Sequence, residues 1–463
     1  MGARVGALAK LVAPRRVADD RAMFRNALLA VSAAAALSGC APSVPKRPSV
    51  VLVLVDQLRH DAAERWLTET RALAARGVRF EGMRAVAPWT YPSVISLLSG
   101  LYPQQHGADG NQEGGLLSTF ADEVPLLPRT LRAAGFRTAG FVTNPFLHEW
   151  NPVHRAFDHY DASFIHNQGP TRGHGELVWT ERMYADSVNT ALLAHYEATP
   201  CVGPEFTYVH YIDVHGRAEG PERWKDAPFE HSYAGAVRYV DAKIRELHEY
   251  FSRRYGGQLL FLVTSDHGQD EGDDLELGEG KPWRKRKASL HDFNLHVPLY
   301  VLPGADVPAG VVVSAACANI DVTPTVLAWL GLPPHANVPG RSLLGALRGE
   351  PYDGERRCLY ARNSAFGRFE EAVVHGGLKY VRYREPRRAL SLFDLATDPR
   401  ESQPVQRDTA AVERCLEEAA DVHGLSFPAR YEPPAPELSE QLRRLGYGGE
   451  DDEAAQDEGK DGK

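Results

Sequence analysis

The chain has 463 residues, of which 43% are hydrophobic and 24% are charged, with 41 glycines and 32 prolines. This composition excludes a disordered or coiled-coil protein, and the length exceeds what one ordinary hydrophobic core serves. The formal net charge of −9 argues against a nucleic-acid-binding protein, because such proteins need basic surface to neutralise phosphates. We therefore expect a large globular domain with a smaller second unit, and no nucleic-acid partner.

The first forty residues have the pattern of a targeting segment. Arg25 precedes an apolar run at 27–37, which is too short to span a bilayer, and small residues then lead to Cys40. The sequence LSGC at 37–40 resembles the lipobox of bacterial lipoproteins, in which the cysteine is lipidated and becomes the first mature residue.

From this resemblance we predict a lipoprotein signal peptide at 1–39, with Met23 as an alternative start, and a linker at 40–48. The resemblance implies a membrane partner through lipidated Cys40 in a bacterial cell envelope, with the protein facing the periplasm. Ala41 after the cysteine favours the outer membrane over the inner membrane.

Four apolar segments predict buried strands of a parallel sheet. In each, an apolar run is followed at once by polar residues, and the segments lie at 49–61, 138–144, 206–215 and 259–268. Helical patterns lie between them, for example at 126–135, which ends in a glycine. Alternating strands and helices indicate an α/β sheet, and such sheets bind ligands at the carboxyl ends of their strands. We expect a single cleft at that edge.

Towards the C-terminus, short alternating segments at 372–383 and 391–395 predict a smaller antiparallel sheet. We therefore place the catalytic domain at 49–345 and a C-terminal subdomain at 346–448. The acidic residues at 449–463 lack an apolar pattern, which predicts a disordered tail.

Four cysteines follow the leader, and an oxidising periplasm would permit disulfides between them. These cysteines are Cys201, Cys317, Cys358 and Cys415. The sequence does not choose among their three possible pairings, and their wide spacing excludes a zinc knuckle.

Residues that favour a divalent metal ion stand at the ends of two predicted strands. Asp56 and Gln57 end the first strand, and Asp266 and His267 end the segment that contains SDHG. Neighbouring strand ends would let these side chains converge on one cation. Each acid also has an ordinary interpretation, since Asp56 could cap the next helix and Asp266 could accept N–H groups of its own turn.

The segment PWTYPSVISLLSGLYPQQHG at 88–107 is the most specific motif of the chain. It resembles the signature of the sulfatase family of the alkaline phosphatase superfamily, which runs Cys or Ser, any residue, Pro, Ser, Arg, and then a helix that ends in Gly before a Tyr-Pro turn. Thr90 occupies the nucleophile position, and Pro92 and Ser93 follow as in the family. Other segments resemble that family in the same order, at 55–57, 264–268, 296–299, 321–333, 392–401 and 442–447.

The resemblance implies an alkaline-phosphatase-like mixed sheet between helices, with a smaller C-terminal antiparallel-sheet subdomain. It also implies one divalent metal ion, either Ca, Mg or Mn, held by Asp56, Gln57, Asp266 and His267. The family more often has Asp where Gln57 stands, and an amide oxygen supplies less charge to the ion.

Three departures from the family pattern bear on the chemistry. Thr90 stands where Cys or Ser is converted to formylglycine, and threonine cannot be converted. Val94 replaces an arginine, and the segment 143–145 replaces a Lys-Trp-His sequence. The chain thus lacks two cations that contact the sulfate or phosphate in that family.

Other positions match the family. His215 corresponds to a substrate histidine, and Lys287, four residues before His291, corresponds to a substrate lysine. We assign catalysis to Thr90 and His215, and substrate binding to Lys287, Asn144 and His291. A plain helix-entry hydroxyl for Thr90 and a structural role for His215 are the ordinary alternatives.

A threonine ester lacks the route by which formylglycine expels sulfate, so external attack must free Thr90. Phosphorus accepts in-line attack with metal help, and the helix start near Pro92 adds positive potential for an anionic ester. We therefore predict a metal-dependent hydrolase of anionic esters, with phosphoric esters favoured over sulfuric ones. The basic segment 281–287 indicates a rim that attracts an anionic substrate or lipid headgroup.

Two other functions stay open: a phosphotransferase acting on lipid headgroups or glycans, and a non-catalytic binding protein that has kept the fold. The motif acids Asp56 and Asp266, present together with Thr90, argue against the second.

Overall fold

The computed structural model describes 47–109, 117–149, 151–166, 184–215, 227–269, 289–354, 357–364, 369–385, 389–420, 427 and 430–432. The predicted leader with Cys40, the basic segment with Lys287 and the acidic tail lie outside these residues. Within them, the α/β class with a smaller antiparallel sheet is confirmed. No helix of the described residues is long and apolar enough to cross a membrane.

A mixed sheet of eight strands forms the centre of the described structure. Beside each other lie β10 (Val311–Val313), β2 (Val78–Phe80), β9 (Leu299–Leu302), β8 (Leu259–Thr264), β1 (Ser49–Val55), β7 (Glu205–Tyr211), β5 (Arg137–Val142) and β6 (His159–Asp161). Only β9 runs against its two neighbours in this sheet. The predicted strands at 49, 138, 206 and 259 are therefore neighbours with a common direction.

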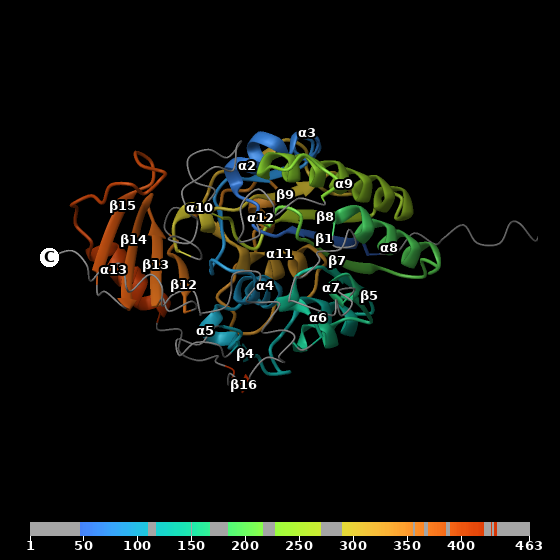
Figure 1. Ribbon diagram of the computed structural model, residues 1–463, viewed down its shortest axis with the longest axis horizontal. Coiled ribbons are helices and arrows are strands. Elements are labelled where there is room, and N and C mark those ends of the chain that lie inside the picture. The colour runs from blue at the N-terminus through green and yellow to red at the C-terminus, as the bar shows by residue number, and fades with distance from the viewer. Residues whose placement is uncertain are drawn as a thin grey trace, which may run out of the picture. The chain divides into compact units, whose positions relative to one another are not determined.

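Both faces of this sheet are covered by helices, as the unbroken apolar run of β1 requires. Val51, Val53 and Val55 share one core with α2 (His60–Trp66), α3 (Thr68–Ala74), α8 (Ala185–Glu197) and α9 (Tyr233–Arg254). The alternate residues of β1 share the other core with α4 (Thr90–Ser99), α6 (Leu127–Ala133) and α11 (Val322–Trp329). Figure 1 shows the two helix layers above and below the sheet.

The C-terminal sheet consists of β12 (Leu359–Asn363), β13 (Phe369–His375), β14 (Leu378–Glu385) and β15 (Ala389–Asp394), all antiparallel. Gly376 and Gly377 join β13 to β14 with φ of 55° and 77°, a conformation that favours glycine in a two-residue hairpin. The helix α13 (Ala410–Ala420) packs on β13, and a disulfide joins Cys358 to Cys415. Cys201 and Cys317 are free thiols.

The remaining elements are short. They are β3 (Met83–Arg84) with β11 (Cys317–Ala318), β4 (Leu117–Thr119) with β16 (Arg430–Glu432), the helices α5 (Pro103–His106), α7 (Ser163–His166), α10 (Asp292–Leu295) and α12 (Leu344–Leu347), and the 3-10 helices Pro145–Leu147, Pro152–Ala156 and Asn319–Asp321.

Candidate functional site

The strand register brings the predicted polar residues to one level. Leu54 of β1 pairs with Thr264 of β8 and with His210 of β7, and His210 pairs with Val142 of β5. Two residues beyond these pairs stand Asp56, Asp266 and Asn144. The parallel strands therefore place three polar side chains at the same edge of the sheet, where α/β sheets bind ligands.

Asp56 does not cap the following helix. The helix α2 begins at His60 and has no side-chain cap. Instead, Asp56 Oδ2 accepts a hydrogen bond from Asn144 Nδ2 at 2.6 Å and one from Thr90 Oγ1 at 3.3 Å. This carboxylate is fully buried and faces the site.

Asp266 divides its two oxygens between the turn and the site. Its Oδ1 accepts the backbone N–H groups of Gln57 at 3.2 Å and His267 at 2.8 Å, so the ordinary turn interpretation holds for this oxygen. Its Oδ2 is buried and accepts no hydrogen bond from the described residues, although His267 Nε2 lies 3.5 Å away. One carboxylate oxygen is thus left directed at the site.

The ring of His267 is oriented by its own turn. Its Nδ1 lies 2.7 Å from Gly268 O, a carbonyl that can only accept a hydrogen bond, so the proton resides on Nδ1. The lone pair of Nε2 then faces Asp56 Oδ1 at 3.8 Å and Thr90 Oγ1 at 3.4 Å.

Thr90 is the first residue of α4 and is fully buried. Its hydroxyl does not cap that helix, because the N-cap residue is Trp89 and no side-chain cap is present. The hydroxyl lies 3.4 Å from Asn144 Nδ2 in addition to its contacts with Asp56 and His267. The helix-entry interpretation therefore does not account for its position.

Gln57 has a strained backbone at the site, with φ of 62°. Its N–H donates to Asp266 Oδ1, and its carbonyl accepts from Tyr233 Oη at 2.8 Å. The side chain is buried. Coordination by its amide oxygen stays a prediction.

These residues fit a divalent cation. Asp56, Asp266 and His267 offer ligand atoms within 4.8 Å of one another, all buried. Buried carboxylates are costly without a compensating charge, and among the described residues Asp266 pairs with no Lys or Arg. Two carboxylates and an imidazole are suitable ligands for a divalent metal ion, but they do not select among Mg²⁺, Ca²⁺ and Mn²⁺.

His210 belongs to this cluster and was missed by our sequence analysis. Its Nε2 lies 3.6 Å from Asp56 Oδ2, and neither ring nitrogen has a hydrogen-bond partner among the described residues. Burial lowers the pKa of His210 to about 4, so the ring is neutral. The available sequence clue was its place near the end of β7, but a strand buried on both faces does not reveal which face its histidine occupies.

Two other predicted residues, His215 and His291, have described contacts with other groups. His215 is buried beyond the end of β7, where its backbone N–H donates to Ile212 O. The ring of His291 contacts Ser289 and stacks on Phe293, with Phe393 of β15 nearby. Lys287 lies outside the described residues. The roles given to these residues stay predictions.

Asn144 is in the site, but its described contacts are with Asp56 and Thr90. Its Oδ1 accepts from Phe146 N at 2.9 Å, which fixes the amide with its N–H groups towards the carboxylate. The Asn144 amide therefore holds Asp56, a proposed metal ligand. The substrate-binding role of Asn144 stays a prediction.

Comparison with known proteins identifies the family of this chain. Residues 48–332 match the sulfatase family, and residues 278–420 match the C-terminal family of N-sulphoglucosamine sulphohydrolase. Arylsulfatase G of Rattus norvegicus is 22% identical over 80% of this chain and 85% of its own length. N-acetylglucosamine-6-O-sulfatase of Bacteroides thetaiotaomicron is 22% identical over 81% of this chain and 86% of its own length.

A solved structure of the same fold is the phosphonate monoester hydrolase of Agrobacterium radiobacter, with a TM-score of 0.59 and 19% identity over 81% of this chain and 95% of that one. The sulfatase match spans more than half of the chain, and it includes Asp56, Thr90, Asp266 and His267. The chain therefore belongs to the sulfatase family, whose members are ester hydrolases that generally use a divalent metal ion.

Proposed function

We propose that this protein hydrolyses anionic esters, phosphoric esters in preference to sulfuric ones, with Thr90 as the nucleophile. One divalent cation would be held by Asp56, Gln57, Asp266 and His267, and would supply positive charge that favours the deprotonated Thr90 hydroxyl.

The observation that carries this proposal is the position of Thr90 Oγ1. It lies 3.3 Å from Asp56 Oδ2 and 3.4 Å from His267 Nε2, which places the hydroxyl next to two of the proposed metal ligands. Asn144 Nδ2 lies 3.4 Å from the same oxygen and donates a hydrogen bond to it, which helps to hold the Thr90 hydroxyl in position. The N-terminus of α4 adds positive potential where an anionic ester would lie.

The reaction then has two steps. The Thr90 oxygen gives its proton to solvent and forms a bond to phosphorus while the bond to the leaving oxygen breaks, and the leaving oxygen takes a proton, which we assign to His215. Water next attacks phosphorus and the bond to Thr90 breaks. One proton of the water goes to Thr90, its hydroxyl leaves as part of the phosphate, and His215 takes up a proton from solvent.

The preference for phosphorus rests on Thr90 and Val94. A sulfothreonine has no second hydroxyl through which to expel sulfate, so it would accumulate after one turnover. Val94 is buried within α4 and offers no positive charge to a sulfate. The related fold of a phosphonate monoester hydrolase supports phosphorus-centred chemistry on this scaffold.

The test of the reaction is steady-state turnover of a nitrophenyl phosphate, a phosphodiester and the matching sulfate, each with Ca²⁺, Mg²⁺ or Mn²⁺. We expect both phosphorus esters to be cleaved faster than the sulfate. Thr90→Ala should remove all activity, and Thr90→Ser should retain some. Sustained sulfate turnover above both phosphorus esters would overturn the proposed chemistry.

The metal site is tested by elemental analysis of Asp56→Ala and Asp266→Ala, which should contain no ion. Asp241→Ala is the matched control, because this buried carboxylate accepts N–H groups of Glu69 and Thr70 at 2.8 Å and has no described contact with the site. One ion per chain in both site variants would show that the site is misplaced.

A phosphotransferase would use the same covalent step with an alcohol as acceptor. Adding candidate alcohols during turnover separates the two activities, since a transferase gives mainly the transfer product and a hydrolase gives mainly free phosphate. A non-catalytic role is opposed by the intact contacts of Thr90 with Asp56 and His267.

For the location, we propose a lipid anchor at Cys40 in the outer membrane of a bacterial envelope. The support is the lipobox-like sequence at 37–40 alone. Cys40→Ser should leave the precursor unprocessed or release the protein, and fractionation of the wild type as a soluble cytoplasmic protein would refute the anchor.

A further inference from the structure

A buried cluster of charges joins the C-terminal sheet to α10. Lys379 of β14 is fully buried, and its Nζ lies 3.0 Å from Asp292 Oδ1 and 2.8 Å from Glu401 Oε1. Glu401 Oε2 accepts the backbone N–H of Asp292, the first residue of α10. Arg84 of β3 binds the same aspartate with both ends of its guanidinium, at 2.7 Å and 3.3 Å.

The charges in this cluster stabilise an ionised Asp292. Burial raises the pKa of its carboxyl, but Arg84 and Lys379 outweigh burial and hold the pKa well below its usual range. Burial, together with the charge of Asp292, raises the pKa of Glu401. Lys379 is therefore the one described residue of the C-terminal sheet whose ammonium compensates both carboxylates.

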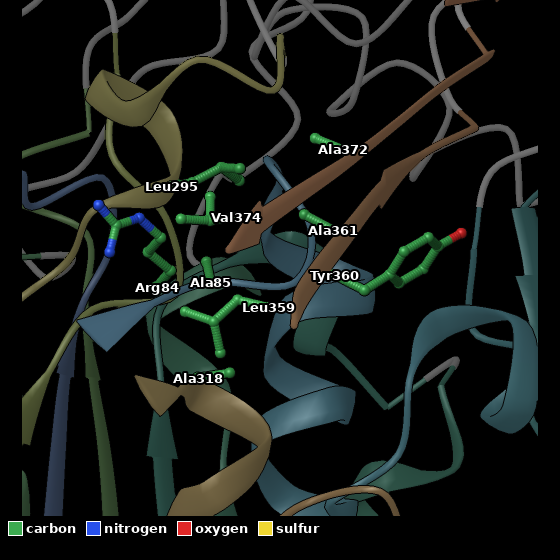
Figure 2. Close-up of a pocket in the computed structure, with 9 residues that line it drawn as sticks. All are labelled: Arg84, Ala85, Leu295, Ala318, Leu359, Tyr360, Ala361, Ala372 and Val374. Carbon is green, nitrogen blue, oxygen red and sulfur yellow. The ribbon is translucent and has the colours of Figure 1, made fainter. Parts of the chain in front are cut away.

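Apolar side chains lie beside this charged cluster. Leu295 of α10 lines a small cavity with Leu359 of β12 and Val374 of β13. Figure 2 shows Leu295 and Val374 beside each other, with Leu359 below them, whereas the Arg84 guanidinium points away from these side chains. The position of α10 thus depends on the charged contacts of Asp292 and on packing against the C-terminal sheet.

The helix α10 is in turn locked to the turn that holds His267. Gly268 N donates to Asn294 O at 2.7 Å, and a Cβ on Gly268 would lie 2.0 Å from Phe293 O, so only glycine allows this approach. Gly268 O accepts the Nδ1 proton of His267. A continuous series of contacts therefore runs from Lys379 through Asp292 and α10 to the His267 ring.

We propose that Lys379 is a positioning residue for the turn Asp266–Gly268, acting through Asp292 and α10. This inference rests on the proposed function, because it assigns the C-terminal sheet the task of orienting His267 as a metal ligand. Outer residues that orient a metal-bound histidine typically change metal affinity by about 10- to 100-fold when removed.

The test compares Lys379→Met with Arg382→Met in the full-length protein. Arg382 lies on the same strand and binds Glu371 at 2.7 Å within the C-terminal sheet, so its loss removes an ion pair that has no described contact with α10. Two quantities are measured well below the unfolding temperature: the dissociation constant for Mn²⁺, and the hydrogen-exchange rate of the Gly268 N–H.

We expect Lys379→Met to weaken Mn²⁺ binding by about tenfold or more and to speed exchange at Gly268 by a similar factor. Arg382→Met should leave both quantities within about twofold of the wild type, even if its unfolding temperature falls. Wild-type values of both quantities in folded Lys379→Met would overturn the inference.

If Lys379→Met does not fold, the double variant Lys379→Met with Glu401→Gln removes one uncompensated carboxylate, and the same two outcomes decide. A wild-type protein that binds no Mn²⁺ would refute the proposed metal site. The exchange rate at Gly268 would then still decide whether Lys379 positions this turn.

Discussion

Asn144 offers a direct test of how Asp56 is held. Its Nδ2 donates to Asp56 Oδ2 at 2.6 Å, and Asn144→Leu keeps a similar volume while removing this donor. A hydrogen bond to a charged group contributes about 1.5–3 kcal/mol, and about 1.4 kcal/mol corresponds to a factor of ten. We therefore expect kcat/KM for a nitrophenyl phosphate to fall by about 10- to 100-fold.

The chain contains a matched control for this change. Asn144 and Asn151 are both buried, both precede a proline, and both cap a 3-10 helix by accepting a backbone N–H, from Phe146 at 2.9 Å and from Val153 at 2.8 Å. Loss of either cap should lower the free energy of unfolding by about 1 kcal/mol.

Asn151 Nδ2 donates to Phe146 O instead of to a site residue. Asn151→Leu should therefore lose stability and keep its activity. Denaturant unfolding and initial rates of both variants give the comparison. Equal kcat/KM in the two variants would show that Asn144 does not hold Asp56 in the active arrangement.

Three further predictions concern stability and pH. Replacing both Cys358 and Cys415 by serine opens a loop with a sequence separation of 57 and should cost about 4 kcal/mol by the chain-entropy relation; a loss below about 1 kcal/mol in urea unfolding would contradict it. Burial lowers the pKa of His106 to about 3, so the folded ring stays neutral while the unfolded chain binds a proton below about 6.5. Stability should therefore fall by about 1.4 kcal/mol per pH unit for this group as the pH drops from 6.5 towards 3, and unfolding of His106→Gln between pH 4 and 7 should show a flatter slope than the wild type. His210→Phe removes two buried nitrogens without hydrogen-bond partners among the described residues and should raise stability by about 1 kcal/mol while lowering kcat/KM; unchanged activity would exclude His210 from the site.

The sequence by itself determined the strands and helices of the layered sheet, because each of them depends on the pattern of neighbouring residues. The apolar run of β1 predicts a strand covered on both faces. The alternating segment predicted at 372–383 is instead two strands, β13 and β14, joined by Gly376 and Gly377. The place of Thr90 before a helix and the polar ends of β1 and β8 also follow from neighbouring residues. The site of Thr90, Asp56 and Asp266 was predicted from these features together with the resemblance of 88–107 to the sulfatase signature.

The tertiary structure decided which groups meet across the sheet. The partnership of Asn144 with Asp56 depends on the register of β1, β7 and β5, a contact between residues 88 positions apart. His210 enters the site only because its face of β7 is turned towards Asp56.

The same limit applies to the disulfide and to the buried cluster at α10. Four cysteines allow three pairings, and only the packing of α13 on the C-terminal sheet brings Cys415 to Cys358. In the sequence, Lys379 stands in an ordinary amphipathic strand, and nothing local shows that its ammonium is fully buried against Asp292. Residue patterns fix which segments form strands and helices, but charge compensation inside the protein depends on segments that are distant in the chain and are brought together only by folding.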